Sequence, residues 1–122
     1  MNVEVLKGKT LANVVATGEE ILFETVGGET YRMYHSQDCC ESVYIESIVG
    51  DLEDLIDSEI LRAEETTDLF DVLRNIDRVK DSDESHTWTF YKFATRKGYV
   101  DIRWYGTSNG YYSESVDFEE VK

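Results

Sequence analysis

Residues 87–105, TWTFYKFATRKGYVDIRWY, decide the fold that we predict for this chain. The stretch is rich in β-branched and aromatic residues, which favour strands, and Arg96-Lys97-Gly98 interrupts it with a turn signal. Two strands joined by a short turn form an antiparallel hairpin. A third strand-like run at 111–121 follows a turn of small residues at 106–110, so we expect the closing third of the chain to form an antiparallel meander.

Alternation along YVDIRWY, residues 99–105, assigns a face to each side chain, because successive residues of a strand point to opposite sides. One face is apolar and suits the core: Val100, Ile102 and Trp104. The opposite face carries flat rings, a guanidinium and a carboxylate: Tyr99, Asp101, Arg103 and Tyr105. Aromatic rings stack on nucleobases, and arginine binds phosphate with two parallel hydrogen bonds. The sequence therefore predicts a ligand site on this second face.

Neighbouring residues of the same types extend this candidate nucleotide site. Stacking is expected from Tyr99, Tyr105, Trp88 or Tyr111. Phosphate contacts are expected from Arg103, Lys92, Arg96 or the turn that contains Asn109, whose small residues expose backbone N–H groups. No nucleotide-binding glycine motif accompanies them, so a subunit interface or plain surface are alternative interpretations of the same face. The ligand and interface interpretations are compatible if a ligand lies between protomers.

The first part of the chain predicts further strands. Short β-branched and aromatic runs at 10–17, 21–26 and 30–35 are separated by glycine-containing turns. Val26-Gly27-Gly28-Glu29 is a hairpin signal. A further run at 59–65 indicates another strand, so we expect about six strands in all.

Two segments predict short helices. The apolar residues between 43 and 57 recur at helical spacing: Ile48, Leu52, Leu55 and Ile56. A second helix is expected over 68–76, with Asp68 as its N-cap. The predicted fold is therefore α+β: a single domain over 1–122, with about six mainly antiparallel strands and one or two short helices packed on the sheet.

Charge restricts the partners that the chain can bind. The net charge is −14, from 26 acidic and 12 basic residues. Such a surface repels the backbone of a long nucleic acid. The charge is uneven, because residues 41–71 carry eleven acids against Arg62, whereas 88–105 carry four bases against Asp101. The acidic stretch is a solvated face or a mimic of a polyanion, and the basic window coincides with the candidate ligand site.

Neither membrane insertion nor secretion is predicted. No apolar run approaches the roughly 18 residues that a membrane-spanning helix needs, and the first residues, MNVEVLKGKT, lack the apolar core of a signal peptide. We therefore expect a cytoplasmic protein without a membrane partner.

Both cysteines of the chain lie in YHSQDCCESV, residues 34–43, close to His35. A structural zinc site normally needs a second pair of ligands, and a Cys–His nucleophile needs a group that orients the base. Neither is evident, so we expect no metal, no cofactor and no catalytic residues. The cysteines are expected to be reduced and buried, because adjacent cysteines form no ordinary strain-free disulfide and a cytoplasmic protein keeps its thiols reduced.

Two long blocks resemble a family of small proteins encoded by tailed phages and prophages, which is classified as a domain of unknown function. The first block begins YRMYHSQDCCESVYIESIVGDLEDL and the second is TWTFYKFATRKGYVDIRWYGTSNGYYSESVDFEE. The similarity covers about residues 6–120, with 66–86 as the variable part. It implies a phage accessory protein in the host cytoplasm, and it brings no assigned active site.

Together, the residues and the resemblance lead to a functional hypothesis. The expected protein is a non-enzymatic homo-oligomer that sequesters a cyclic nucleotide or a related phosphate-containing signal of host immunity without cleaving it, as an anti-CBASS sponge would. The alternative is an acidic inhibitor whose helix around 51–57 occupies the basic groove of a host defence nuclease. An enzyme that uses the thiols is the third and weakest interpretation.

Overall fold

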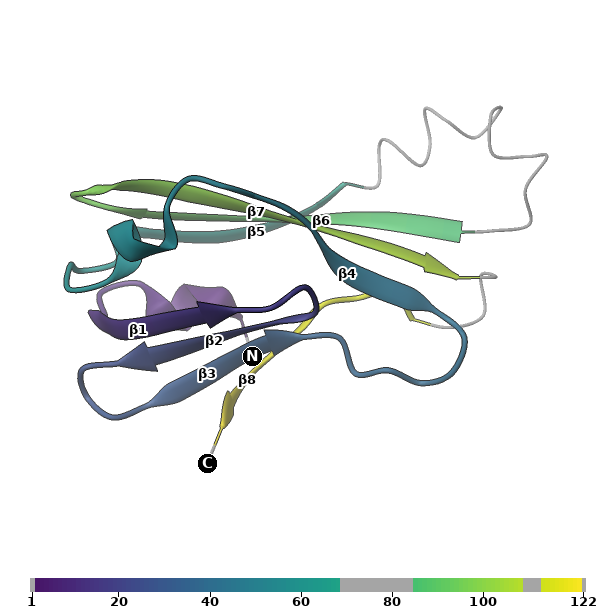
Figure 1. Cartoon of the computed structure of the whole chain (residues 1–122), viewed down its shortest axis with the longest axis horizontal. Coiled ribbons are helices and arrows are strands. Elements are labelled where there is room, and N and C mark those ends of the chain that lie inside the picture. Colours follow the sequence, from purple (N-terminus) through teal and green to yellow (C-terminus); the bar gives the residue numbers. More distant parts are fainter. Residues whose placement is uncertain (1, 69–84, 109–112, 122) are drawn as a thin grey trace.

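The computed structural model describes residues 2–68, 85–108 and 113–121, which form two four-stranded antiparallel sheets packed face to face (Figure 1). The first sheet has the strand order β1 (Leu11–Ala16), β2 (Glu20–Thr25), β3 (Thr30–Tyr34), β8 (Asp117–Val121). The second sheet has the order β4 (Ser42–Val49), β7 (Gly98–Ser108), β6 (Ser85–Thr95), β5 (Arg62–Asp68).

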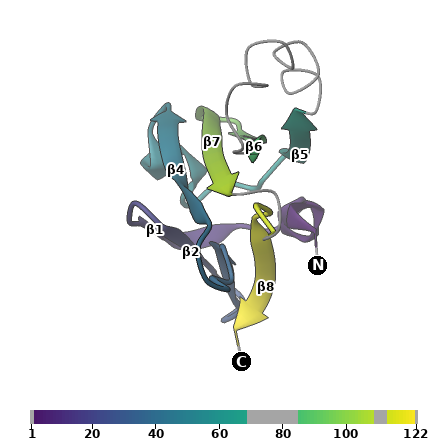
Figure 2. The same ribbon diagram turned by 90° about the vertical axis from the view of Figure 1, so that its right-hand side faces the viewer.

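The chain builds the first sheet as a meander of β1, β2 and β3 and then crosses to the second sheet. There β4 and β5 form the two edges, and the long β6–β7 hairpin fills the centre. The predicted early strands and the central hairpin are therefore confirmed. The predicted closing meander is wrong at its third strand, because β8 returns to the first sheet and pairs with β3 (Figure 2).

The core lies between the two sheets. Phe23 on β2 meets Phe93 on β6 with ring centroids 5.6 Å apart. Trp104 on β7 donates its indole N–H to the sulfur of Met33 on β3, at 3.3 Å. The predicted core face of β7 is confirmed, because Val100, Ile102 and Trp104 are all buried. Burial of these apolar side chains from both sheets is the main force that holds the layers together.

The helix predicted between 43 and 57 is wrong, because its residues divide between β4, which contains a bulge, and a short 3₁₀ segment at Leu52–Leu55. Val43, Ile45 and Ile48 all contact the core, although a regular strand would alternate every two residues. The pairing of β4 with β7 shifts between Ile45 and Ser47, which inserts Glu46 as an extra residue. The bulge thus restores Ile48 to the core side of β4, while the other residues of the predicted helical stripe, Leu52, Leu55 and Ile56, lie in or next to the 3₁₀ segment.

Helical structure in the described residues is confined to two 3₁₀ segments, η1 (Val3–Leu6) and η2 (Leu52–Leu55). The fold is therefore mainly β, which corrects the expected α+β class. Asp68, the expected N-cap of a second helix, ends β5, and the rest of that predicted helix lies outside the described residues. Neither helical segment of the described chain has the length or apolarity to cross a membrane.

Candidate functional site

The solvent-facing side of the second sheet carries the candidate site. On β7 it presents the four predicted residues Tyr99, Asp101, Arg103 and Tyr105. Strand register places Trp88, Phe90 and Lys92 of β6 beside them. The neighbouring strands add Tyr44, Glu46, Ser47 and Val49 from β4 and Arg62, Glu64 and Thr66 from β5. We call these residues together the outer face.

An aromatic cluster occupies one end of the outer face. The ring centroids of Trp88 and Tyr105 are 4.5 Å apart, and Tyr44 and His86 lie 6.0 and 6.2 Å from Tyr105. The guanidinium carbon of Arg103 lies 5.2 Å from the centre of the Trp88 ring, which is cation–π distance. The cluster therefore combines flat rings with a positive charge, as the sequence predicted.

Arg103 also forms an ion pair that the sequence did not predict. Its Nε lies 2.5 Å from Oε2 of Glu46, and both side chains are partly exposed. Glu46 is the extra residue of the β4 bulge. The sequence predicted a helix over this segment, and a helix has no such bulge, so nothing placed Glu46 beside Arg103. Nε is the one guanidinium nitrogen of Arg103 that is hydrogen-bonded within the described chain, so the terminal nitrogens remain available to an anion.

Two adjoining depressions hollow the middle of the outer face. The first has a volume of about 440 Å³ and is lined by side chains that include Ser47, Val49, Thr66, Phe90, Lys92, Asp101 and Arg103. The second has a volume of about 360 Å³ and is lined by Arg62, Tyr99 and neighbouring residues. Lys92 and Asp101 line both depressions, so a cationic and an anionic residue lie where the two depressions adjoin.

Lys92 differs from the other cations of the outer face in its pairing. Arg103 pairs with Glu46, and Arg62 pairs with Glu64 at 2.7 Å. Lys92 is exposed, and among the residues that the structure describes no carboxylate lies within ion-pair distance of its Nζ. Strand register sets Lys92 between Glu64 and Asp101, but its ammonium forms no ion pair with either carboxylate, so it stays available to a small anion.

The structure divides the predicted site residues into groups. Trp88, Arg103 and Tyr105 lie together, and Lys92 connects them to Tyr99 in the second depression. Tyr99 and Tyr105 are six residues apart on one strand, roughly 20 Å, so one base cannot contact both. Arg96 lies in the β6–β7 turn and lines neither depression. Asn109 and Tyr111 lie outside the described residues.

Sequence reasoning missed Phe90 in the floor of the first depression. The signal was present, because Phe90 alternates with Trp88 and Lys92 along the same strand. The same two-residue period that assigned the face of β7 would have assigned this face of β6.

A polar cleft of about 610 Å³ lies between the sheets, beside the β1–β2 turn, and is lined by residues of β3 and β4. Both of its basic side chains, Arg32 and His35, are paired with carboxylates of the same cleft. Arg32 bonds to Glu20 through its Nε and lies 3.7 Å above the Tyr34 ring, and His35 pairs with Glu41. The cleft therefore has no unpaired cation among its described lining residues for an anionic ligand, whereas the outer face has Lys92.

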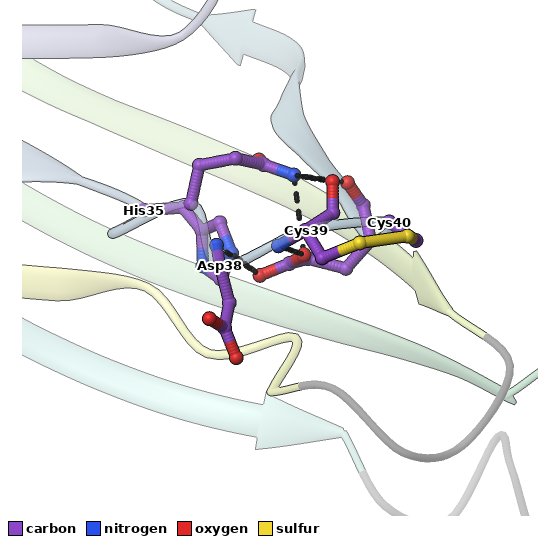
Figure 3. Close-up of a disulfide and its surroundings, with 6 residues drawn as sticks. His35, Asp38, Cys39 and Cys40 are labelled. Carbon is purple, nitrogen blue, oxygen red and sulfur yellow. Dashed lines mark hydrogen bonds and ion pairs between the residues drawn. A yellow bond between two sulfur atoms is a disulfide. The ribbon is translucent and has the colours of Figure 1, made fainter.

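The expectation of reduced, buried cysteines is wrong. Cys39 and Cys40 are both exposed and are joined to each other by a disulfide with an S–S distance of 2.07 Å (Figure 3). The buried groups of this segment are instead the side chains of His35 and Glu41. The cysteines lie where the chain bends outward between β3 and β4, which exposes them to solvent.

Glu41 is held by several hydrogen bonds in this loop. Its Oε1 accepts the backbone N–H of Cys39 and its Oε2 accepts that of Asp38, both at 2.9 Å. The amide of Gln37 donates to Oε1 at 3.1 Å, and Nε2 of His35 lies 2.8 Å from Oε2 (Figure 3). Burial raises the pKa of Glu41, but the hydrogen bonds from Cys39, His35 and Asp38 outweigh it and lower the pKa to about 2.

His35 connects three segments of the chain. Its Nδ1 lies 2.6 Å from the carbonyl oxygen of Ser115, which can only accept, so Nδ1 carries a proton. Its Nε2 lies within hydrogen-bond distance of Oε2 of Glu41, so the ring bridges the segment before β8 and the segment before β4. Both ring nitrogens of His35 have hydrogen-bond partners, and both cysteine sulfurs are in the disulfide. We call His35 and Glu41 together the clasp, because they join the ends of β3, β4 and β8.

No group of three or more histidine, cysteine or acidic side chains is placed to hold a metal ion within the described ranges. The candidate site therefore rests on the outer face, where rings, cations and depressions coincide.

The chain belongs to a family known as a domain of unknown function, DUF7448, whose model matches residues 4–118. The expected membership of an uncharacterised family is thereby confirmed. No curated protein and no solved structure matches the chain. The family brings no activity and no residue roles to the outer face.

Proposed function

Because the family has no known activity to transfer, we propose from the site itself that this protein is a non-catalytic binding protein for a phosphate-containing nucleotide. The ligand occupies the depressions of the outer face. The observation that carries this proposal is that Lys92, which forms no ion pair with any described carboxylate, lines both depressions, with the Arg103–Trp88 pair beside it.

The chemistry of the first depression suits such a ligand. Phe90 offers an apolar surface on which a base can stack, while Lys92 and the terminal nitrogens of Arg103 bind phosphate oxygens. A volume of about 440 Å³ lies within the usual range for small-molecule sites. The strongly acidic remainder of the protein repels long polyanions, whereas a small anion that reaches Lys92 is attracted at short range.

Within this class we favour a cyclic nucleotide, which the protein would hold intact. The two depressions share Lys92. A cyclic dinucleotide, whose two bases are joined through one sugar–phosphate ring, can therefore place its bases in neighbouring depressions around this common cation. The similarity to phage and prophage proteins supports a role in the host cytoplasm as a counter-defence protein that sequesters an immune signal.

The alternative of an acidic inhibitor has less support. It depended on a helix that would align the acids around 51–57 along one face. That segment instead contains the four-residue turn η2, capped by the side chain of Asp51, so its carboxylates do not follow helical spacing.

The test is a binding assay with a panel of cyclic nucleotides. We expect Lys92→Ala and Arg103→Ala each to weaken retention by at least about tenfold, because each removes a charge-assisted contact. Arg96→Ala is the matched control, since Arg96 is an exposed cation of the same hairpin outside both depressions, and its effect should stay within about twofold.

After binding, the protein is denatured and the released nucleotide is identified by mass spectrometry. Recovery of intact nucleotide supports a sequestering protein. Recovery of a cleaved nucleotide replaces it with an enzyme, and no uptake of any member of the panel contradicts the proposal.

A further inference from the structure

The outer face exposes several large apolar side chains along its length. Tyr44 is 40%, Val49 55% and Tyr99 63% exposed, and the half-buried rings of Trp88 and Phe90 lie among them. The other exposed large apolar residues of the described chain are dispersed over separate elements: Val5, Val15, Val26, Leu61 and Val121. A concentration of exposed apolar side chains on one face marks an interaction site.

The charge of the outer face identifies its partner. It carries three cations, Arg62, Lys92 and Arg103, and three described anions, Glu46, Glu64 and Asp101. The whole chain has a net charge of −14, so two copies repel each other through most of their surfaces. The outer face is the place where a second copy meets balanced charge and apolar contact together.

The dimensions of the second sheet suit a dimer. Its two central strands each have 11 residues, so they are roughly 36 Å long. The edge strands β4 and β5 have 8 and 7 residues, so four strands spaced about 4.8 Å apart give a face of roughly 590 Å². A stable interface of standard size buries about 800 Å² on each partner, so this sheet can supply most of one.

We propose that two copies of this chain associate through their outer faces about a two-fold axis, and that the nucleotide is enclosed between them. This inference rests on the proposed function for its ligand. Each depression is open to solvent in one copy, whereas tight retention of a nucleotide requires that most of its surface be buried. The second copy supplies the missing wall and a second set of Lys92 and Arg103. A cyclic dinucleotide has two bases and two phosphates, which match a two-fold site.

The experiment measures the oligomeric state by sedimentation equilibrium between about 1 and 200 μM, with and without cyclic nucleotide. We expect wild-type protein to dimerise and Val49→Asp to weaken the dimer by at least about 30-fold, because it buries an unpaired charge in the interface. Val15→Asp is the matched control. Val15 is 48% exposed on β1 of the other sheet, so this substitution should leave the dimer unchanged.

A second variant, Tyr99→Ser, guards against a folding defect in Val49→Asp and should also weaken the dimer. Circular dichroism checks that each variant keeps its strands. A wild-type protein that stays monomeric with and without nucleotide overturns the inference, as does a dimer that survives both outer-face substitutions.

Native mass spectrometry separates this inference from the proposed function. The probe is the tightest binder of the panel, or cyclic di-AMP where none binds. One nucleotide per two chains supports both proposals. A tight complex of one nucleotide with one chain supports the function and overturns the enclosed dimer. A dimer that is disrupted by Val49→Asp but takes up no nucleotide removes the ligand and retains the interface.

Discussion

Glu41 is a residue whose burial and charge have a measurable consequence. In the folded protein its pKa is about 2, compared with an ordinary value of 4.5. Between these pH values the unfolded chain binds a proton that the folded chain does not, so folding stability falls as pH decreases through this window. Above it, the stabilisation from the clasp is fully present.

We therefore predict that Glu41→Gln lowers stability at pH 7 and reduces the loss of stability between pH 4.5 and 2. The measurement is the midpoint of urea unfolding at several pH values. Glu19→Gln is the control, because Glu19 is exposed, and it should preserve the acid sensitivity of wild type. Equal acid sensitivity in wild type and Glu41→Gln would contradict the assignment.

Single charges on the outer face behave differently according to their pairing. An exposed ion pair such as Arg62–Glu64 contributes little to stability, typically less than about 1 kcal/mol. Lys92 forms no ion pair with a described carboxylate, so it makes no ion-pair contribution to the stability of the described fold. Its position at the junction of two depressions is instead suited to a ligand, which is why binding rather than stability tests it.

At the scale of elements, β4 shows where prediction from the sequence ends. Local alternation identified β1, β2, β3, β6 and β7, because each lies close in sequence to a partner. The helical spacing of Ile48, Leu52, Leu55 and Ile56 instead joined the end of β4 to η2, and it gave no sign of the residue inserted in β4. The same insertion positions Glu46 beside Arg103, so the error in the fold concealed part of the site.

Gly50 joins β4 to the segment that contains η2, and its backbone leaves no room for a side chain. Its φ is +105°, and a Cβ atom there would overlap the carbonyl oxygen of Tyr99 on β7. We predict that Gly50→Ala lowers the free energy of unfolding by at least about 2 kcal/mol, through both backbone strain and this overlap. Urea unfolding measures the loss.

Gly28 provides the comparison that separates the two causes. It also has a positive φ, +92°, but nothing lies within 4 Å of a Cβ built on it. Gly28→Ala should therefore lose only about 1 kcal/mol, the cost of the backbone conformation alone. If both variants lost the same amount, contact with Tyr99 would not be the reason that Gly50 is required.

At the scale of the whole molecule, long-range pairing was the part of the fold that sequence could not supply. The strand propensity of β8 was recognisable, but its partner β3 lies more than 80 residues earlier in the chain. The clasp has the same origin, because His35 meets a carbonyl that precedes β8. The face of the candidate site followed from alternation within β7, whereas the depressions and the charge pairs depend on how β4, β5 and β6 surround it.

Net charge gives the last prediction, which concerns how salt affects association. Each copy has a charge of −14, so two copies repel at long range. The screening length falls from about 30 Å at 0.01 M salt to about 8 Å at 0.15 M. Apolar contacts between outer faces are not weakened by this screening, so we predict that the dimer becomes at least about threefold tighter over that range.

Binding of nucleotide by Lys92 and Arg103 should respond in the opposite direction, because salt screens their attraction for phosphate. Sedimentation equilibrium and nucleotide titration at the same salt concentrations measure the two effects in one protein. An uncharged solute at matched osmolality controls for changes in water activity. A dimer that weakens as salt increases would mean that ion pairs between copies, rather than apolar contact between outer faces, hold it together.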